Sequence, residues 1–157
     1  MKSITVQNLT KTYGKKNEKV LAVDHVSFEV NHGEIFGLIG PDGAGKTSIF
    51  RMLTTVLLPN SGSASIENFD VVKDYKEIRK ILGYMPGKFS LYQDLTIEEN
   101  LEFFASVFNT TIAENYDLIK DIYIQIEPFK DRRAGKLSGG MKQKLALCCA
   151  LIHKPKV

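Results

Sequence analysis

The chain has 157 residues, of which 43% are hydrophobic and 25% are charged. This composition is that of an ordinary globular domain able to bury a core, and it excludes a disordered chain. The formal net charge of +3, with lysines spread among acidic residues, gives no indication of a nucleic-acid partner.

The N-terminal stretch predicts two antiparallel strands. Apolar and polar residues tend to alternate over Ile4–Tyr13 and Val23–Val30, as expected for strands with one face in water. The lysine-rich residues 15–19 are predicted to connect them. The first residues lack the apolar core and cleavage site of a signal peptide, so we expect a cytoplasmic chain.

A buried strand and a glycine-rich loop are predicted next. After a turn at residues 31–33, Ile35–Ile39 is a near-continuous apolar run, typical of a strand covered on both faces in a mostly parallel sheet. Residues 40–47, Gly-Pro-Asp-Gly-Ala-Gly-Lys-Thr, follow and fit the pattern G-x-x-x-x-G-K-[ST]. Apolar residues then recur at helical spacing from Ile49 to Leu57, and residues 58–62 are expected to end that helix.

Shorter elements follow in the middle of the chain. We expect a strand around Ser65–Ile66, a helix over Asp74–Ile81 and another strand at Leu82–Met85. Pro86 and Gly87 then break the pattern.

Two capping boxes predict the helices of an all-helical insert. In Thr96–Glu99 and Thr111–Glu114, a hydroxyl and a carboxylate can satisfy free backbone N–H groups at a helix start. Each box opens an amphipathic segment, and Pro128 closes the insert. The apolar faces comprise Ile97, Leu101, Phe104 and Phe108 in the first segment, and Ile112, Tyr116, Ile119, Tyr123 and Ile126 in the second.

Residues 137–143, Leu-Ser-Gly-Gly-Met-Lys-Gln, open the last predicted helix, whose apolar face runs to Ile152. Ser138 is a good N-cap, and the two glycines after it leave the first amides uncovered, which makes a second potential anion site. Taken alone, such a helix start is common. Cys148 and Cys149 are adjacent and too cramped for a normal disulfide, so we interpret them as small buried apolar residues. The apolar run that contains them is much shorter than the ~20 residues a bilayer requires.

The glycine-rich loop has the chemistry of a polyphosphate site. Gly40, Gly43 and Gly45 let backbone N–H groups wrap a phosphate closely, and the following helix adds its positive dipole end. The Lys46 ammonium can reach two phosphates, and the Thr47 hydroxyl can bind Mg²⁺. The alternative is a glycine turn without a ligand, which the position between an apolar run and a helix disfavours.

The phosphate loop, followed downstream by Leu137-Ser-Gly-Gly-Met-Lys-Gln143, resembles the ATP-binding subunit of an ABC (ATP-binding cassette) transporter. The resemblance covers essentially the whole chain, and residues 89–105 are most similar to cassettes of multidrug-type exporters. It implies an α/β fold: a P-loop NTPase core with an antiparallel β subdomain and an inserted helical subdomain, incomplete at the C-terminus. The implied division is 1–87 for the core and β subdomain, 88–136 for the helical subdomain and 137–157 for the Leu-Ser-Gly-Gly motif and its helix.

The resemblance also implies the site residues. It makes Tyr13 the aromatic residue that stacks on adenine, although a tyrosine at a strand end is by itself more often core or rim. It places the Leu-Ser-Gly-Gly segment on an ATP molecule held by a second, head-to-tail cassette. The implied nucleotide contacts are Tyr13, Gly40, Pro41, Asp42, Gly43, Ala44, Gly45, Lys46, Thr47 and Ser48, with Thr47 also a metal ligand. The implied contacts to the second ATP are Leu137, Ser138, Gly139, Gly140 and Gln143.

The sequence departs from the family pattern at three points. Asp42 stands where the family more often has asparagine, and a carboxylate near phosphates is mildly repulsive unless it points to solvent. Gly87 stands where a glutamine that contacts Mg²⁺ and the attacking water is expected, and Gln93 cannot be assumed to replace it. Residues 1–157 contain no match to the Walker B aspartate, the catalytic glutamate or the switch histidine. We therefore expect no catalytic residue in this chain, and none of its three histidines lies at the switch position.

The resemblance predicts an ABC-type ATPase subunit that binds Mg·ATP at a dimer interface and couples hydrolysis to transport through a membrane permease. It would lie on the inner face of the cell membrane, held there by the permease. Residues 1–157 alone are expected to bind ATP and to hydrolyse it poorly. Two alternatives stay open: a non-catalytic nucleotide-binding regulatory cassette, which Gly87 favours, and a soluble ABC-type ATPase.

Overall fold

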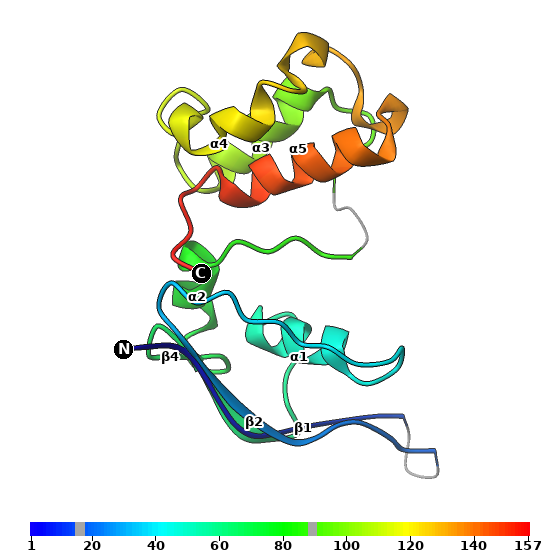
Figure 1. The fold of residues 1–157 in the computed structure, drawn as a ribbon, viewed down its shortest axis with the longest axis vertical. Coiled ribbons are helices and arrows are strands. Elements are labelled where there is room, and N and C mark those ends of the chain that lie inside the picture. The colour runs from blue at the N-terminus through cyan, green and yellow to red at the C-terminus, as the bar shows by residue number, and fades with distance from the viewer. Residues whose placement is uncertain (15–17, 88–90) are drawn as a thin grey trace. The chain divides into compact units, whose positions relative to one another are not determined.

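The computed structural model describes residues 1–14, 18–87 and 91–157, in two compact units (Figure 1). The first unit comprises residues 1–80 with Val157, and the second comprises residues 81–156. Part of the predicted connecting loop, at 15–17, and the predicted start of the helical subdomain, at Lys88, lie outside the described residues. The division of the chain at 87 and 136 stays a prediction.

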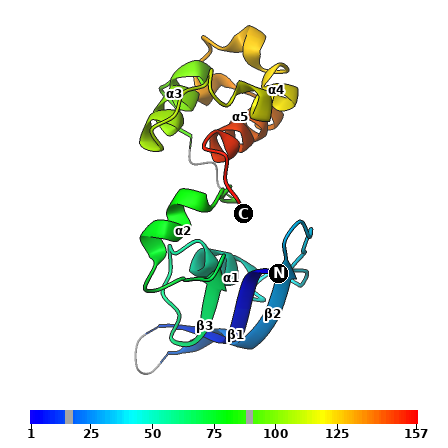
Figure 2. The same cartoon turned by 90° about the vertical axis from the view of Figure 1, so that its left-hand side faces the viewer.

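The first unit is built on a four-stranded antiparallel sheet in the order β2-β1-β3-β4. Figure 2 shows β1 between β2 and β3. Its strands are β1 (Lys2–Tyr13), β2 (Val20–Asn31), β3 (Ser61–Ile66) and β4 (Phe69–Asp70). Val6 lies opposite Phe28 on β2 and opposite Ala64 on β3, so the alternating apolar pattern of β1 faces one side of the sheet. The predicted antiparallel pair and the short third strand are confirmed.

Helix α1 (Lys46–Leu53) contacts β2 and β3, and its buried face consists of Ile49, Met52 and Leu53. This helix is shorter than the sequence indicated. Thr55 adopts a left-handed backbone conformation with φ 60°, and the N–H groups of Val56 and Leu57 both donate to the Arg51 carbonyl. A left-handed residue closes a helix in this way because it turns the chain back onto the last free carbonyls.

Two predicted strands are wrong. Residues 34–41 and 82–86 form no strand, and the side chains of Ile35 and Ile39 are fully exposed (101% and 99%). A strand exists only where a neighbour pairs with it, and every ladder among the described residues is antiparallel and excludes both segments. Their continuous apolar runs are typical of central parallel strands, but no such neighbour lies within the described part of the chain.

Helix α2 (Tyr75–Ile81) confirms the predicted short helix and leads from the first unit into the second. The second unit contains α3 (Ile97–Val107), α4 (Tyr116–Tyr123) and α5 (Gly139–Leu151), with two short 3₁₀ turns, η1 (Glu127–Phe129) and η2 (Ala134–Lys136). Helix α5 contacts both α3 and α4, and the three bury one apolar core. Its fully buried members include Ile97, Leu101, Ile119, Ile126, Leu145, Cys148 and Ile152.

The first predicted capping box is confirmed, and the second closes a turn rather than a helix. At α3, the Glu99 N–H donates to the Thr96 hydroxyl while the Thr96 N–H donates to the Glu99 carboxylate. The same reciprocal pair forms between Thr111 and Glu114, but α4 begins only at Tyr116. The hydrogen bonds are therefore as the sequence indicated, and the helix start is four residues later than its box would place it.

Asn100 on α3 is a wholly buried polar side chain of the second unit, with 0% exposure. Its Oδ1 accepts from the Tyr92 N–H at 2.9 Å, and its Nδ2 donates to the carbonyls of Tyr92, Leu95 and Thr96 at 3.1, 3.3 and 2.7 Å. Every hydrogen-bonding group of the amide is satisfied, which is what makes its burial tolerable. Asn100 thus fixes the segment that leads into α3.

Cys148 and Cys149 are buried and unbonded, which confirms their interpretation as small apolar residues. Burial raises the pKa of the Cys148 thiol to about 12 and raises the pKa of Cys149 as well. Both thiols stay protonated at neutral pH and are poor nucleophiles. Within the described ranges, no helix is both long and apolar enough to cross a bilayer.

Candidate functional site

The glycine-rich loop, residues 40–47, curls directly into α1. The Ala44 N–H donates to the Pro41 carbonyl at 3.2 Å, and the first helical bond runs from the Ile49 N–H to the Gly45 carbonyl at 3.0 Å. Gly45 is left-handed with φ 84°, and a Cβ added to it would lie 2.0 Å from the Ala22 carbonyl oxygen on β2. The loop therefore packs against the sheet at a distance that only glycine permits.

The Lys46 side chain folds back over this loop. Its Nζ donates to the carbonyls of Gly40 and Pro41 at 2.6 and 2.7 Å. The ammonium is consequently held above the loop, where it concentrates positive charge on the concave side. An anion bound there would meet this charge together with the N–H groups of the loop.

The start of α1 adds its own field. Gly45 is the N-cap, and no side chain in the described part of the chain caps the first N–H groups of the helix. These groups and the positive dipole end face a cavity of about 330 Å³. Tyr13, Ala22 and residues 42–48 line it.

Tyr13 reaches the cavity from the end of β1. Its hydroxyl lies 3.0 Å from the Ser48 hydroxyl on α1, and the Lys11 ammonium lies 5.6 Å from the centroid of its ring. The residue is 38% exposed, so its ring is available to a planar ligand that enters the cavity. The structure therefore brings Tyr13 to the phosphate loop, as an adenine-stacking role requires.

Three loop residues are open toward the cavity. A Cβ added to Gly43 would contact nothing within 4 Å among the described residues, so the backbone is open to close approach at that point. Thr47 is exposed at the cavity, where its hydroxyl can bind a metal. Asp42 is exposed and lines the same cavity, which keeps its carboxylate in solvent and limits its repulsion of an anion.

The Leu-Ser-Gly-Gly motif lies in the second unit. The Ser138 hydroxyl accepts from the Met141 N–H at 3.3 Å and caps α5, while Leu137 is buried beneath it. A Cβ on Gly139 or on Gly140 would touch nothing within 4 Å, and Gln143 is exposed on the first turns of α5. The amides at this helix start are thus as open as the sequence indicated.

Two contacts around the first cavity could not be predicted from the sequence. Ala22 supplies the carbonyl against which Gly45 packs, and Ser48 supplies the hydroxyl that meets Tyr13. Both contacts join segments distant in the chain. No sequence motif identifies Ala22 as a residue of the loop cavity.

Gly87 is exposed, with no described atom within 4 Å of an added Cβ, so a longer side chain would fit at this position. Gln93 does not substitute for one, because its Nε2 donates to the nearby Leu91 carbonyl at 3.2 Å.

The three histidines lie away from the loop cavity. His25 pairs with Asp24 at 2.5 Å on an exposed stretch of β2, and His32 lies 3.5 Å from Glu67. His153 stacks on Phe108 with ring centroids 3.8 Å apart, and burial lowers its pKa.

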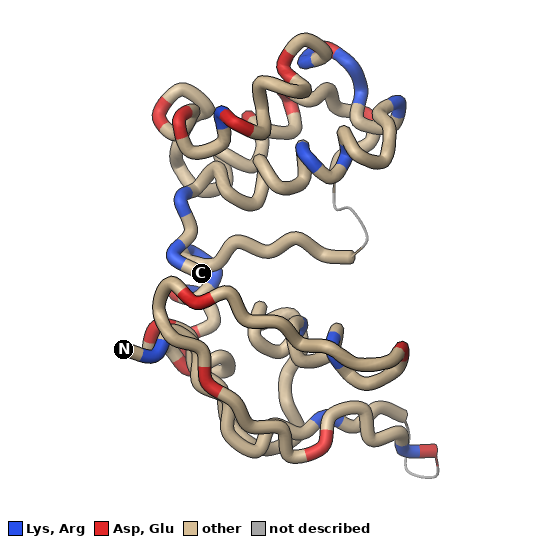
Figure 3. Tube along the Cα trace, viewed as in Figure 1, with Lys and Arg blue, Asp and Glu red and all other residues tan. Residues whose placement is uncertain are grey.

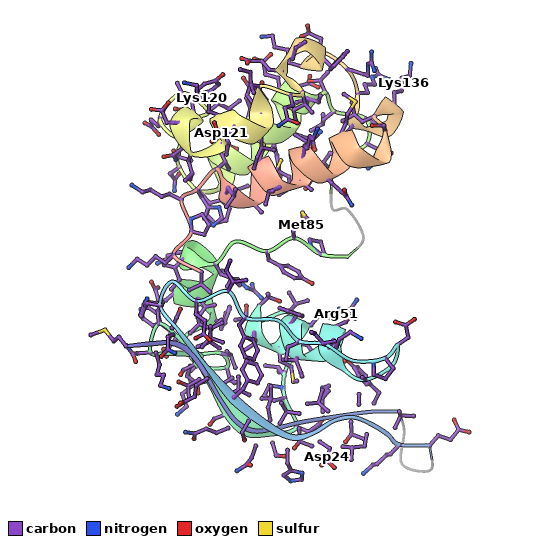
Figure 4. All side chains as sticks on the ribbon, viewed as in Figure 1. Asp24, Arg51, Met85, Lys120, Asp121 and Lys136 are labelled. Atoms are coloured by element: carbon purple, nitrogen blue, oxygen red, sulfur yellow. The ribbon has the colours of Figure 1, made fainter. Side chains whose placement is uncertain are left out.

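Acidic and basic residues are interspersed along each unit rather than gathered on one stretch (Figure 3). Arg51 of α1 and Lys136 of η2, which lie in different units, are labelled in Figure 4, and neither lines the loop cavity. Among the described residues that line this cavity, the positive charge comes from Lys46.

Comparison with known proteins adds three findings. A family model described as "ABC transporter" matches residues 23–157. The chain is 43% identical over 156 residues to a probable multidrug ABC transporter ATP-binding protein, YbhF, of Escherichia coli, covering 98% of this chain and 27% of that protein. It is 34% identical over 157 residues to the ABC transporter ATP-binding protein NatA of Bacillus subtilis, covering 98% of this chain and 64% of that protein.

The fold is similar to a solved dimeric structure of the ATP-binding cassette MJ0796 in a post-hydrolysis state bound to ADP and Pi. The TM-score is 0.84 at 25% sequence identity, over 97% of this chain and 70% of that one. This likeness confirms the predicted α/β fold. The chain spans less than two thirds of the length of both relatives.

Proposed function

Because the chain belongs to the ABC transporter family, we propose that its glycine-rich loop binds the polyphosphate of Mg·ATP and that the chain serves as the ATP-binding part of a transporter. The observation that carries this proposal is the loop cavity. In it, an uncapped helix start, the Lys46 ammonium and the Tyr13 ring converge on about 330 Å³. That combination suits an anion attached to a planar base.

Each residue has a distinct task in binding. The backbone N–H groups at Gly43, Ala44 and Gly45 donate to phosphate oxygens, and Lys46 exchanges its bonds to two neutral carbonyls for stronger bonds to anionic phosphate oxygens. Tyr13 holds the base by stacking, and the hydrogen bond between its hydroxyl and that of Ser48 fixes the orientation of the ring. Thr47 would hold Mg²⁺, which neutralises phosphate charge when bound.

The second motif suggests a paired assembly. We propose that Ser138 and the open amides of Gly139 and Gly140 contact an ATP molecule held by the loop of another, head-to-tail cassette. The dimeric MJ0796 structure supports pairing in this family. The transporter names of the relatives support a membrane permease as the further partner and a peripheral position on the membrane.

For hydrolysis, we propose that residues 1–157 alone bind ATP with little turnover. Phosphoryl transfer depends on groups that position the metal and the attacking water. Gly87 has no side chain to do so, and Gln93 is bonded elsewhere. Gly87 also favours a second candidate function, a regulatory cassette in which ATP shifts the dimer equilibrium without turnover.

Titration calorimetry with Mg·ATP tests the proposal on the wild type, Lys46→Met and Lys120→Met. Loss of the Lys46 ammonium should weaken binding by about tenfold or more, because hydrogen bonds to charged groups contribute about 1.5–3 kcal/mol. Lys120 is exposed on α4 in the other unit, so its variant removes the same charge and should bind like wild type. Equal affinity in all three proteins would refute the site.

Sedimentation in the presence of ATP, combined with a phosphate-release assay, separates the two functions. ATP-dependent dimerisation accompanied by phosphate release supports the transporter ATPase. Dimerisation without phosphate release, in a protein that extends beyond residue 157, supports the regulatory cassette.

A further inference from the structure

The second unit contains a cavity unrelated to the phosphate loop. It has a volume of about 590 Å³ and lies among α3, α4 and the segment that contains η1. This volume falls in the range of small-molecule sites, about 300–1,000 Å³. The residues that line it include Glu98, Glu102, Tyr116, Tyr123, Glu127 and Lys130.

The carboxylates of this cavity outnumber its cations. Lys130 donates to Glu98 at 2.9 Å, and this pair neutralises one of the three glutamates. Glu127 accepts a hydrogen bond from the Tyr116 hydroxyl at 3.1 Å, and it forms no ion pair with a described residue. Glu102 has no ion-pair partner among the residues that the structure describes. Two negative charges therefore remain on the wall.

Tyr123 supplies an independent sign of a ligand. The residue is only 3% exposed and lines the cavity, and its hydroxyl makes no hydrogen bond to any described residue. A ligand or a water molecule in the cavity would supply the missing hydrogen bond of this hydroxyl. The pKa of Tyr123 is raised to about 12, mainly by burial and to a smaller extent by the nearby charges of Glu98 and Glu127. The hydroxyl thus stays protonated close to the carboxylates.

The remaining wall is apolar and aromatic. Tyr116 and Tyr123 meet edge to face with ring centroids 6.0 Å apart, and Ala105 and Ile112 add aliphatic surface. Aromatic faces and carboxylates together favour organic ammonium groups on an aliphatic chain. A bare metal ion fits less well, because no cluster of three or more His, Cys, Asp or Glu residues in described positions could hold one.

From this arrangement we infer that the cavity among α3, α4 and η1 binds a small aliphatic diamine in its diammonium form, with Glu102 and Glu127 as its counter-charges. The Tyr123 hydroxyl accepts a hydrogen bond from one ammonium group. The tyrosine rings and Ile112 cover the aliphatic chain. This site lies within the second unit and does not depend on nucleotide binding.

Titration calorimetry with 1,4-diaminobutane tests the inference at about 150 mM salt, where the Debye length of about 8 Å screens diffuse attraction. The wild type should show saturable binding in the millimolar range or tighter. The uncharged isostere 1,4-butanediol should not bind. Glu127→Gln should weaken diamine binding about tenfold, because the amide still accepts from Tyr116 but carries no charge. Tyr123→Phe, which keeps the ring, should weaken it about fivefold.

The matched control is Asp121→Asn, which removes one negative charge from α4 outside the cavity lining (Figure 4). Its diamine affinity should stay within about twofold of wild type, since an exposed charge contributes little. Circular dichroism of each variant verifies the fold, and Glu102→Gln, at an exposed position, provides a charge variant that does not disturb the core. Absence of diamine binding, equal weakening by Asp121→Asn, or displacement of the diamine by millimolar Mg²⁺ would each overturn the inference.

Discussion

Gly43 and Gly45 allow two costs of placing alanine in the phosphate loop to be measured separately: the strain of a left-handed backbone and the steric overlap of the added Cβ with β2. Both are left-handed, with φ of 83° and 84°, so alanine at either position should cost about 1–2 kcal/mol of backbone strain. At Gly43 the added Cβ meets nothing within 4 Å. At Gly45 it would lie 2.0 Å from the Ala22 carbonyl oxygen and 3.1 Å from the Val23 side chain.

Gly45→Ala must therefore displace the loop from β2 as well. Overpacking of this kind costs about 1–3 kcal/mol more, which gives a total loss of about 2–5 kcal/mol for Gly45→Ala against about 1–2 kcal/mol for Gly43→Ala. Urea denaturation followed by far-ultraviolet circular dichroism measures the loss in unfolding free energy. Hydrogen exchange on peptides from β2 and α1 should show lost protection in Gly45→Ala and near-native protection in Gly43→Ala.

Equal destabilisation by the two substitutions would refute the reasoning. It would mean that backbone conformation alone accounts for the glycine requirement and that the contact with Ala22 contributes nothing. Loss of protection confined to the second unit would refute it as well, since neither glycine lies there.

Three further predictions concern the second unit. Asn100→Ala should lower the free energy of unfolding by about 1–3 kcal/mol in urea denaturation, because it leaves the Tyr92 N–H without its partner and removes a second donor from the carbonyls of Tyr92, Leu95 and Thr96; a loss below about 1 kcal/mol would contradict this. Burial lowers the pKa of His153, so the folded state favours the neutral ring, and stability should fall as pH drops below the unfolded value of 6.5. Urea denaturation at neutral pH and at about pH 5 measures this loss in unfolding free energy. The loss should be smaller in His153→Phe, which keeps a ring stacked on Phe108, than in wild type. Ser138→Ala should cost about 1 kcal/mol in the same assay by removing the cap of α5, and an unchanged midpoint would show that the cap is not stabilising.

Local signals in the sequence predicted much of this molecule. The alternation in β1 and β2, the capping box at Thr96 and the N-cap at Ser138 each depend on residues near one another in the chain, and all three are confirmed. The phosphate loop is likewise local, because its glycines, Lys46 and the helix start follow one another directly.

Features that depend on distant partners could not be predicted in the same way. Ile35–Ile39 has the composition of a strand, but strand formation requires a neighbour, and composition does not supply one. The meeting of Tyr13 with Ser48, and of Gly45 with Ala22, arises from how the sheet and α1 pack. The diamine cavity combines side chains of two helices and η1, so no single motif indicates it.

The exposed segment around Ile35 and Ile39 has a practical consequence for handling the protein. Two exposed β-branched side chains lie beside backbone that joins no ladder among the described residues, so this stretch can pair with a strand of another molecule. Lysine at either isoleucine would be the first substitution to try when the chain precipitates.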